Sequence, residues 1–289
     1  MSQFLQYTLQ GLAAGGFYAL AALGLAVIFG VLGVVNFSHG ACYMLGAMAS
    51  ALLLKNLDLG FWPALVIVPV LMFVFGVVIE RLFVQWLLKL DPLYNFLLTF
   101  GLTLFTVDLM KRLYGVSSQP YEVPAGLRGR LSLGSVDLST YQLFAAGFSL
   151  LVCAAVWLVL TKTRVGMIVR AGIEDSVMVD SLGINVYKVF MVVFGIGAMA
   201  AGFAGIVNAP VVSLTPDVGE AILVQTFVVV VIGGVGSFTG AILGGLIAGE
   251  IISITSMINP GYAYVVLFAA MTLVLMVRPH GLLGVKGRE

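Results

Sequence analysis

Long apolar runs separated by short polar breaks make up almost the whole chain. Most runs hold about 20 residues, the length an α-helix needs to cross the hydrocarbon core of a bilayer. We predict spans at 9–32, 37–54, 62–81, 94–112, 141–160, 188–210, 221–233, 239–257 and 262–277. The pattern therefore predicts an all-α polytopic membrane protein with about nine transmembrane helices, in a range of eight to ten.

The predicted seventh span is the shortest, because Gly233-Gly234 and Gly236-Ser237 interrupt its apolar run. Short, glycine-broken helices in transporters can line the pathway of the solute. Gly233, Gly234 and Ser237 are therefore candidate pathway or gate residues. The alternative for the glycines is close packing of helix backbones, since small residues are enriched where helices meet in lipid.

A second break, at 33–40, contains Asn36 and His39. Polar groups at membrane depth are costly unless they face protein or water, so both residues are further pathway or gate candidates. Asn is also a favoured residue at helix N-termini, so capping of the second span is the alternative for Asn36.

Glu250 and Asp108 are the two acids furthest inside apolar runs. Intramembrane carboxylates often mark paths for protons or ions. Asp108 lies one helical turn from Lys111 and Arg112, which indicates an interfacial ion pair. Glu250 has no basic neighbour in sequence and is the better functional candidate, although a buried, hydrogen-bonded carboxyl is an equal alternative.

The composition supports one membrane domain over residues 1–289. The chain is 61% hydrophobic and 9% charged, with a mean hydropathy of +1.13. No phosphate-binding loop and no metal-binding histidine motif occur. We therefore expect no catalytic site, cofactor or metal in this chain, and nothing resembles a surface for nucleic acid.

The segment 163–184 is the most polar stretch between two spans. With its flanking lysines it holds seven of the charged side chains, out of 14 Lys and Arg and 13 Asp and Glu in the chain. It contains no proline, which favours a short helix at the membrane surface. An apolar face at helical spacing, with Asp175 intruding on it, suits the groove of a protein partner better than a lipid surface. The residues of that face are Met167, Ala171, Met178 and Leu182, with Arg170 and Glu174 beside it.

The basic residues predict the orientation of the spans. With the N-terminus outside, nine Lys and Arg residues fall on the inner side and five on the outer side. The excess of positive charge on cytoplasmic loops then favours an outside N-terminus and a cytoplasmic C-terminus. In this orientation 163–184 is cytoplasmic, and 114–140 is an irregular periplasmic loop rich in proline, glycine and serine.

Several motifs, in order along residues 11–284, resemble the membrane permease subunits of branched-chain amino acid ABC importers. The motifs are Gly15-Gly16-Phe17-Tyr18-Ala19-Leu20 with Gly24-Leu25, Asn36-Phe37-Ser38-His39-Gly40, Tyr43-Met44-Leu45-Gly46-Ala47, Thr163-Arg164-Val165-Gly166, Arg170-Ala171, Gly183-Ile184-Asn185, Gly233-Gly234-Val235-Gly236-Ser237 and Arg278-Pro279-His280-Gly281-Leu282-Leu283-Gly284. The N-terminal motif is closer to the shorter of the two permeases in such systems.

The resemblance implies a permease in a prokaryotic inner membrane that works with a homologous second permease, two ATP-binding cassette subunits and a periplasmic substrate-binding protein. It also implies that 163–184 contains the coupling helix that contacts the ATPase. The coupling residues would be Arg170, Ala171, Glu174, Asp175 and Gly183. The substrate would be a branched-chain or other hydrophobic amino acid, with urea or short amides as alternatives. A self-sufficient secondary carrier or channel that uses Glu250 or Asp108 as its ion site is the rival function.

Overall fold

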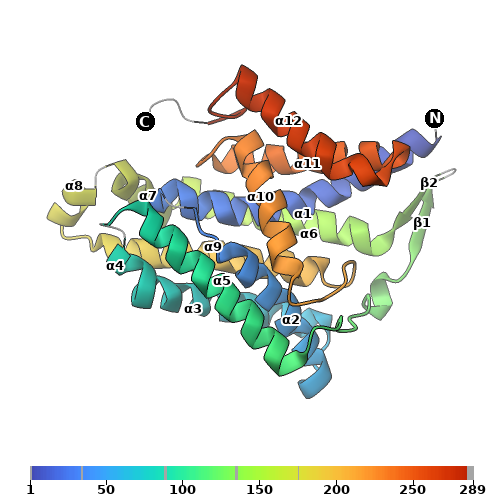
Figure 1. The fold of residues 1–289 in the computed structure, drawn as a ribbon, viewed down its shortest axis with the longest axis horizontal. Helices are drawn as coiled ribbons and strands as arrows, with labels where there is room; N and C mark the ends of the chain where they lie inside the picture. Colours follow the sequence, from blue (N-terminus) through green and yellow to red (C-terminus); the bar gives the residue numbers. More distant parts are fainter. Residues whose placement is uncertain (1, 34, 88–89, 134–135, 175, 285–289) are drawn as a thin grey trace.

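The computed structural model describes residues 2–33, 35–87, 90–133, 136–174 and 176–284 (Figure 1). The helices are α1 (Ser2–Leu32), α2 (His39–Leu57), α3 (Phe61–Ile79), α4 (Gln85–Leu87), α5 (Pro92–Tyr114), α6 (Thr140–Lys162), α7 (Arg164–Glu174), α8 (Ser176–Ser181), α9 (Val186–Asn208), α10 (Val218–Gly233), α11 (Phe238–Ile258) and α12 (Ala263–Val277). A π-helical turn, Glu80–Val84, joins α3 to α4. Single 3-10 turns occur at Ala125–Leu127 and Pro260–Tyr262.

Within the described residues, eight helices are long and apolar enough to cross a membrane, so the chain is a multi-pass, all-α membrane protein. They correspond to the predicted spans except the seventh. In its place lies α10, an apolar helix of 16 residues. Its C-cap is Gly234, so the glycines that shorten the apolar run also end the helix.

The connection between α5 and α6 differs from its predicted form. The loop 114–140 is not wholly irregular, because β1 (Arg130–Leu133) and β2 (Val136–Ser139) form an antiparallel hairpin with Leu131 opposite Leu138. Within 163–184 the described residues are helical over α7 and α8, in keeping with the predicted helical segment. Asp175, between them, lies outside the described residues.

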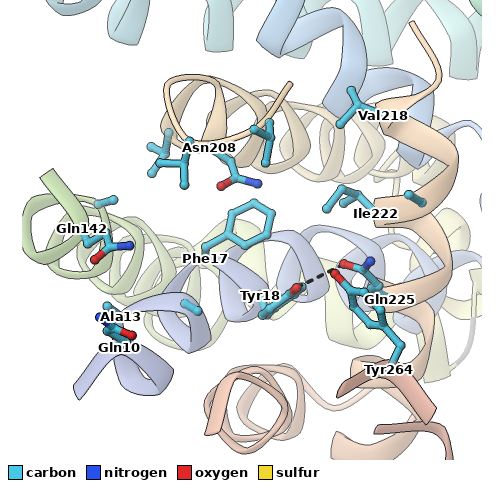
Figure 2. A pocket seen from close by; sticks show the side chains of 16 residues that line it. Gln10, Ala13, Phe17, Tyr18, Gln142, Asn208, Val218, Ile222, Gln225 and Tyr264 are labelled. Carbon is cyan, nitrogen blue, oxygen red and sulfur yellow. Dashed lines mark hydrogen bonds between the residues drawn. The ribbon is translucent and has the colours of Figure 1, made fainter. Parts of the chain in front are cut away.

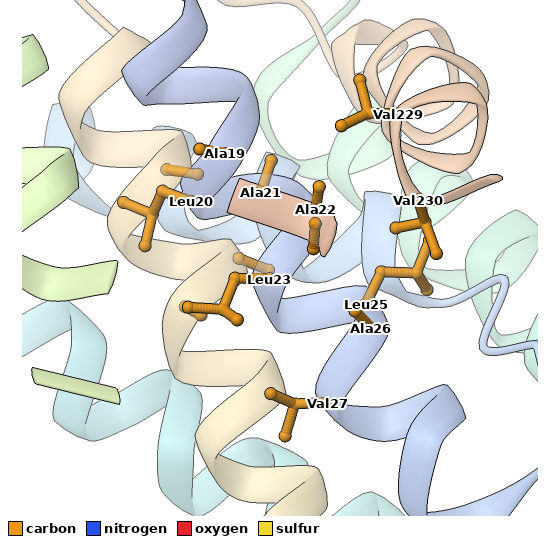
Figure 3. Packing of buried hydrophobic residues seen from close by; sticks show 14 of the residues in the cluster. Ala19, Leu20, Ala21, Ala22, Leu23, Leu25, Ala26, Val27, Val229 and Val230 are labelled. Carbon is orange, nitrogen blue, oxygen red and sulfur yellow. The ribbon is translucent and has the colours of Figure 1, made fainter. Parts of the chain in front are cut away.

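Helix α1 forms the centre of the bundle. From Ala19 to Ile28 its apolar side chains are at most 1% exposed. It packs along α11, α9, α6 and α10, and Figure 3 shows its alanines and leucines beside Val229 and Val230 of α10. An apolar helix that is buried on all sides needs neighbours that approach it closely, because lipid tails solvate apolar side chains as well as protein does.

Glycines provide that close approach. A Cβ atom added to Gly46 of α2 would lie 2.6 Å from the Cα atom of Gly202 of α9. On the opposite side of the bundle, a Cβ atom at Gly245 or Gly249 of α11 would overlap the backbone of α1. Close packing of helix backbones therefore explains these glycines, because the helices touch through their backbones.

We predict that Gly46→Leu lowers the melting temperature of the purified protein in detergent more than Gly147→Leu does. A side chain at Gly46 must displace the backbone of α9, whereas no described atom lies within 4 Å of a Cβ atom at Gly147 on α6. Overpacking of a tight core costs about 1–3 kcal/mol. Equal melting temperatures of the two variants would contradict direct backbone contact between α2 and α9.

Candidate functional site

Two candidate regions lie at opposite ends of the helix bundle. Residues 163–185, with α7 and α8, join the end of α6 to the start of α9 at one end. The start of α6 and the end of α9 lie at the other, on the side of the β1–β2 hairpin and the N-terminus (Figure 1). A cavity opens at this second end.

The cavity has a volume of about 330 Å³, within the usual range for small-molecule pockets. Its walls come from α1, α6, α9, α10, α12 and the connection between α9 and α10. The lining residues are Gln10, Ala13, Ala14, Phe17, Tyr18, Gln142, Ala145, Val207, Asn208, Val211, Val212, Val218, Ala221, Ile222, Gln225 and Tyr264. None of them carries a charge, and four carboxamides converge from four different helices.

Two of these carboxamides are held by tyrosines. The Tyr18 hydroxyl donates a hydrogen bond to Oε1 of Gln225 over 3.2 Å, and Nδ2 of Asn208 donates to the Tyr43 hydroxyl over 3.0 Å. Figure 2 shows Gln10 and Gln142 on one side of Phe17, and Tyr18, Gln225 and Tyr264 on the other. The cavity therefore has two polar ends separated by an aromatic ring.

The sequence patterns do not predict this cavity. The available signal was Gln225, a carboxamide in the middle of the apolar helix α10. A polar side chain at such a position is expected to face a cavity or the bundle interior. Its partners on α1, α6 and α9 are far away in sequence, so their convergence becomes visible only in the fold.

Asn36 and His39 lie away from the cavity, in the buried turn between α1 and α2. Oδ1 of Asn36 accepts hydrogen bonds from the backbone nitrogen of Ser38 over 3.0 Å and from its hydroxyl over 2.6 Å. Asn36 thus closes the turn itself, and Ser38 occupies the N-cap position of α2 without a side-chain capping bond. Nε2 of His39 lies 3.0 Å from the carbonyl oxygen of Ala21, a hydrogen bond that ties α2 to α1.

Gly233, Gly234 and Ser237 form the turn between α10 and α11. The Ser237 hydroxyl accepts a hydrogen bond from the backbone of Gly240 over 3.0 Å and so caps α11. The backbone nitrogens of Leu282 and Leu283 donate to the carbonyl oxygens of Ile232 and Gly233, each over 2.9 Å.

Gly234 has φ +110, and a Cβ atom there would overlap the backbone of Gly284. The motifs at 233–237 and 278–284 therefore pack on each other. Their spacing along the sequence does not predict this contact.

Glu250 and Asp108 occupy two further, separate positions. Oε1 of Glu250 is buried and has no hydrogen-bond partner among the residues that the structure describes. It lies beside an apolar groove lined by residues of α1, α11 and α12, including Leu12, Ile247 and Val266. Asp108 accepts a bond from Nε of Arg112 over 2.7 Å, with both side chains exposed, so the predicted ion pair is confirmed.

The segment 163–184 presents its apolar face outward. The exposed fractions are 61% for Met167 and Met178 and 70% for Leu182, and Ala171 is also exposed. Val169 and Val179 are buried against the bundle instead. The predicted face is thus available to a partner.

Of the predicted coupling residues, Arg170 has a contact within the chain. Its guanidinium donates hydrogen bonds to the carbonyl oxygens of Leu160 and Thr161, in the last turn of α6. Cations in this position satisfy carbonyl groups that have no partner in the helix. Gly183 has φ +80 and closes the turn after α8. Glu174 is the last residue of α7, and Asp175 falls outside the described residues.

Residues 7–275 match the profile of a family described as the permease component of branched-chain amino acid transport systems. The high-affinity branched-chain amino acid transport system permease protein LivH of Escherichia coli strain K12 is 31% identical over 97% of this chain and 96% of its own length. BraD of Pseudomonas aeruginosa, described in the same words, is 30% identical over the same shares. LivM of Escherichia coli is 26% identical over 92% of this chain and 67% of its own length. No solved structure gives a significant match.

Proposed function

The chain belongs to the family of permease components of branched-chain amino acid transport systems, and on that premise we propose that it is the permease subunit of an ATP-driven importer for branched-chain or other hydrophobic amino acids. The observation that carries this proposal is the family match, which runs over residues 7–275. ATP hydrolysis is assigned to separate subunits, since the chain holds no phosphate-binding loop.

Four kinds of subunit would form the working complex. This chain would pair with a homologous second permease, and the pair would bind two ATP-binding cassette subunits and a periplasmic substrate-binding protein. Similarity to both LivH and LivM supports two related permeases. The chain spans 96% of LivH but 67% of LivM, which favours the shorter of the two kinds.

The α7–α8 segment is our proposed contact for the ATPase. Met167 and Leu182 of this segment are 61% and 70% exposed, and a groove on a partner would bury them. Arg170 would contribute indirectly, because its hydrogen bonds to α6 fix the position of α7. Ala171 and Gly183 lie on the exposed side of the segment and would contact the partner directly. Glu174 and Asp175 stay candidates from the sequence.

The orientation that fits this proposal has the N-terminus in the periplasm and the C-terminus in the cytoplasm of an inner membrane. The cavity and the N-terminus then share the periplasmic end, and α7 and α8 lie at the cytoplasmic end (Figure 1). A solute delivered by a periplasmic binding protein would enter at the cavity end, opposite the ATPase.

We predict that Met167→Asp lowers the ATP hydrolysis stimulated by the binding protein at least about tenfold, because a few central, buried residues carry most of the binding energy of an interface and the substitution buries a charge there. The test uses the complex reconstituted in vesicles. Met167 is 61% exposed, so its substitution does not disturb the packing of the chain. Met167→Leu keeps the apolar contact and is the matched control. Unchanged hydrolysis with Met167→Asp, in a complex of normal composition, would show that the ATPase docks elsewhere.

The secondary-carrier alternative uses Glu250 or Asp108 as its ion site. Asp108 is exposed and paired with Arg112, so an experiment on Glu250 separates the two functions. In vesicles with the ATPase and binding protein, we expect Glu250→Gln to retain ATP-driven leucine uptake that ignores an imposed proton gradient. The physical reason is that the neutral isostere fits the same apolar groove, and ATP supplies the driving force. Uptake that follows the gradient without ATP, and that vanishes in Glu250→Gln, would contradict the ABC importer.

A further inference from the structure

We infer that the cavity between α1, α6, α9, α10 and α12 is a transit site that binds a small solute with no net charge, through carboxamides at its polar ends and an apolar wall between them. The inference deepens the proposed function and rests on it. It assigns solute contact to this chain and to four named side chains, Gln10, Gln142, Asn208 and Gln225.

The polar ends suit a solute that carries both donors and acceptors. A carboxamide offers an acceptor oxygen and two donor hydrogens, so it can bind a carboxylate, an ammonium or an amide without a fixed charge of its own. Oε1 of Gln225 already accepts from Tyr18, which orients this side chain and leaves its NH2 group as a donor. Amino acids with an aliphatic side chain carry one carboxylate and one ammonium and are neutral overall.

Among the described residues, the lining holds no charged side chain, and this sets the selectivity. A solute with a net charge would leave water for a site that offers it no counter-charge, and burial of an unpaired charge is costly. The lining therefore disfavours acidic and basic amino acids. Phe17, Val218 and Ile222 provide an apolar surface on which an aliphatic side chain can lie.

Packing alone does not account for these residues. At Gly46, Gly245 and Gly249 the helices touch backbone to backbone, with no room for a Cβ atom. Here the helices stay apart, and the polar side chains face the space between them (Figure 2). The cavity also lies at the end of the bundle opposite α7 and α8, where an entering solute would arrive.

The first test fills the cavity in the reconstituted complex. Ala221→Phe, on the cavity wall, should lower ATP-driven leucine uptake at least about tenfold, because the ring overfills the space, while stimulated ATP hydrolysis continues. Val224→Phe, on the same helix, is the matched control. Val224 is 52% exposed and does not line the cavity, so both activities should match those of the unmodified complex. Equal uptake by the two variants would overturn the inference.

The second test keeps the inference falsifiable if Ala221→Phe does not assemble. Cysteine at Ala221 should react with a small membrane-impermeant methanethiosulfonate, and saturating leucine should slow that reaction severalfold. Lysine and glutamate should not slow it. Absence of protection by leucine, or equal protection by the charged amino acids, would overturn the inference even where the unmodified complex imports leucine. Absence of ATP-driven leucine uptake by the unmodified complex would instead contradict the proposed function.

Discussion

Direct backbone contact between helices is the constraint on which this structure depends. In lipid, apolar burial does not draw helices together, so their association relies on close packing and hydrogen bonds. Gly46 against Gly202 sets the distance between α2 and α9, and Gly249 sets that between α11 and α1. The position of α2 in turn places Tyr43 where its hydroxyl accepts the bond from Asn208. The glycine contacts between α2 and α9 thus help to position Asn208 in the wall of the cavity.

Helices α6 and α9 connect the two candidate regions. Gln142, in the first turn of α6, and Asn208, the last residue of α9, line the cavity, and the α7–α8 segment joins the other ends of the same helices. Arg170 fixes α7 to the last turn of α6. A displacement imposed on α7 by an ATPase would therefore move two walls of the cavity without requiring any helix to unfold. This connection gives the proposed coupling a physical route.

The sequence predicts those features that depend on local patterns. The spans, the short α10, the Asp108–Arg112 pair and the outward face of 163–184 follow from hydropathy and helical spacing. The cavity could not be predicted, because its four carboxamides come from helices distant in the chain. The same holds for the packing of Gly234 on Gly284 and for the guanidinium of Arg170, which bonds to a preceding helix. The sequence pattern does not predict the β1–β2 hairpin, because its two strands are only four residues long.

The most direct test of the proposed function asks whether the cavity and the α7–α8 segment face opposite sides of the membrane. Val211→Cys lies at the cavity and Leu182→Cys in the segment, at positions 54% and 70% exposed. The native Cys42 and Cys153 are buried and should stay unreactive. With a membrane-impermeant maleimide on intact cells, we expect labelling of Val211→Cys alone, and labelling of Leu182→Cys only after permeabilisation. Labelling of both positions from one side would contradict the proposed function.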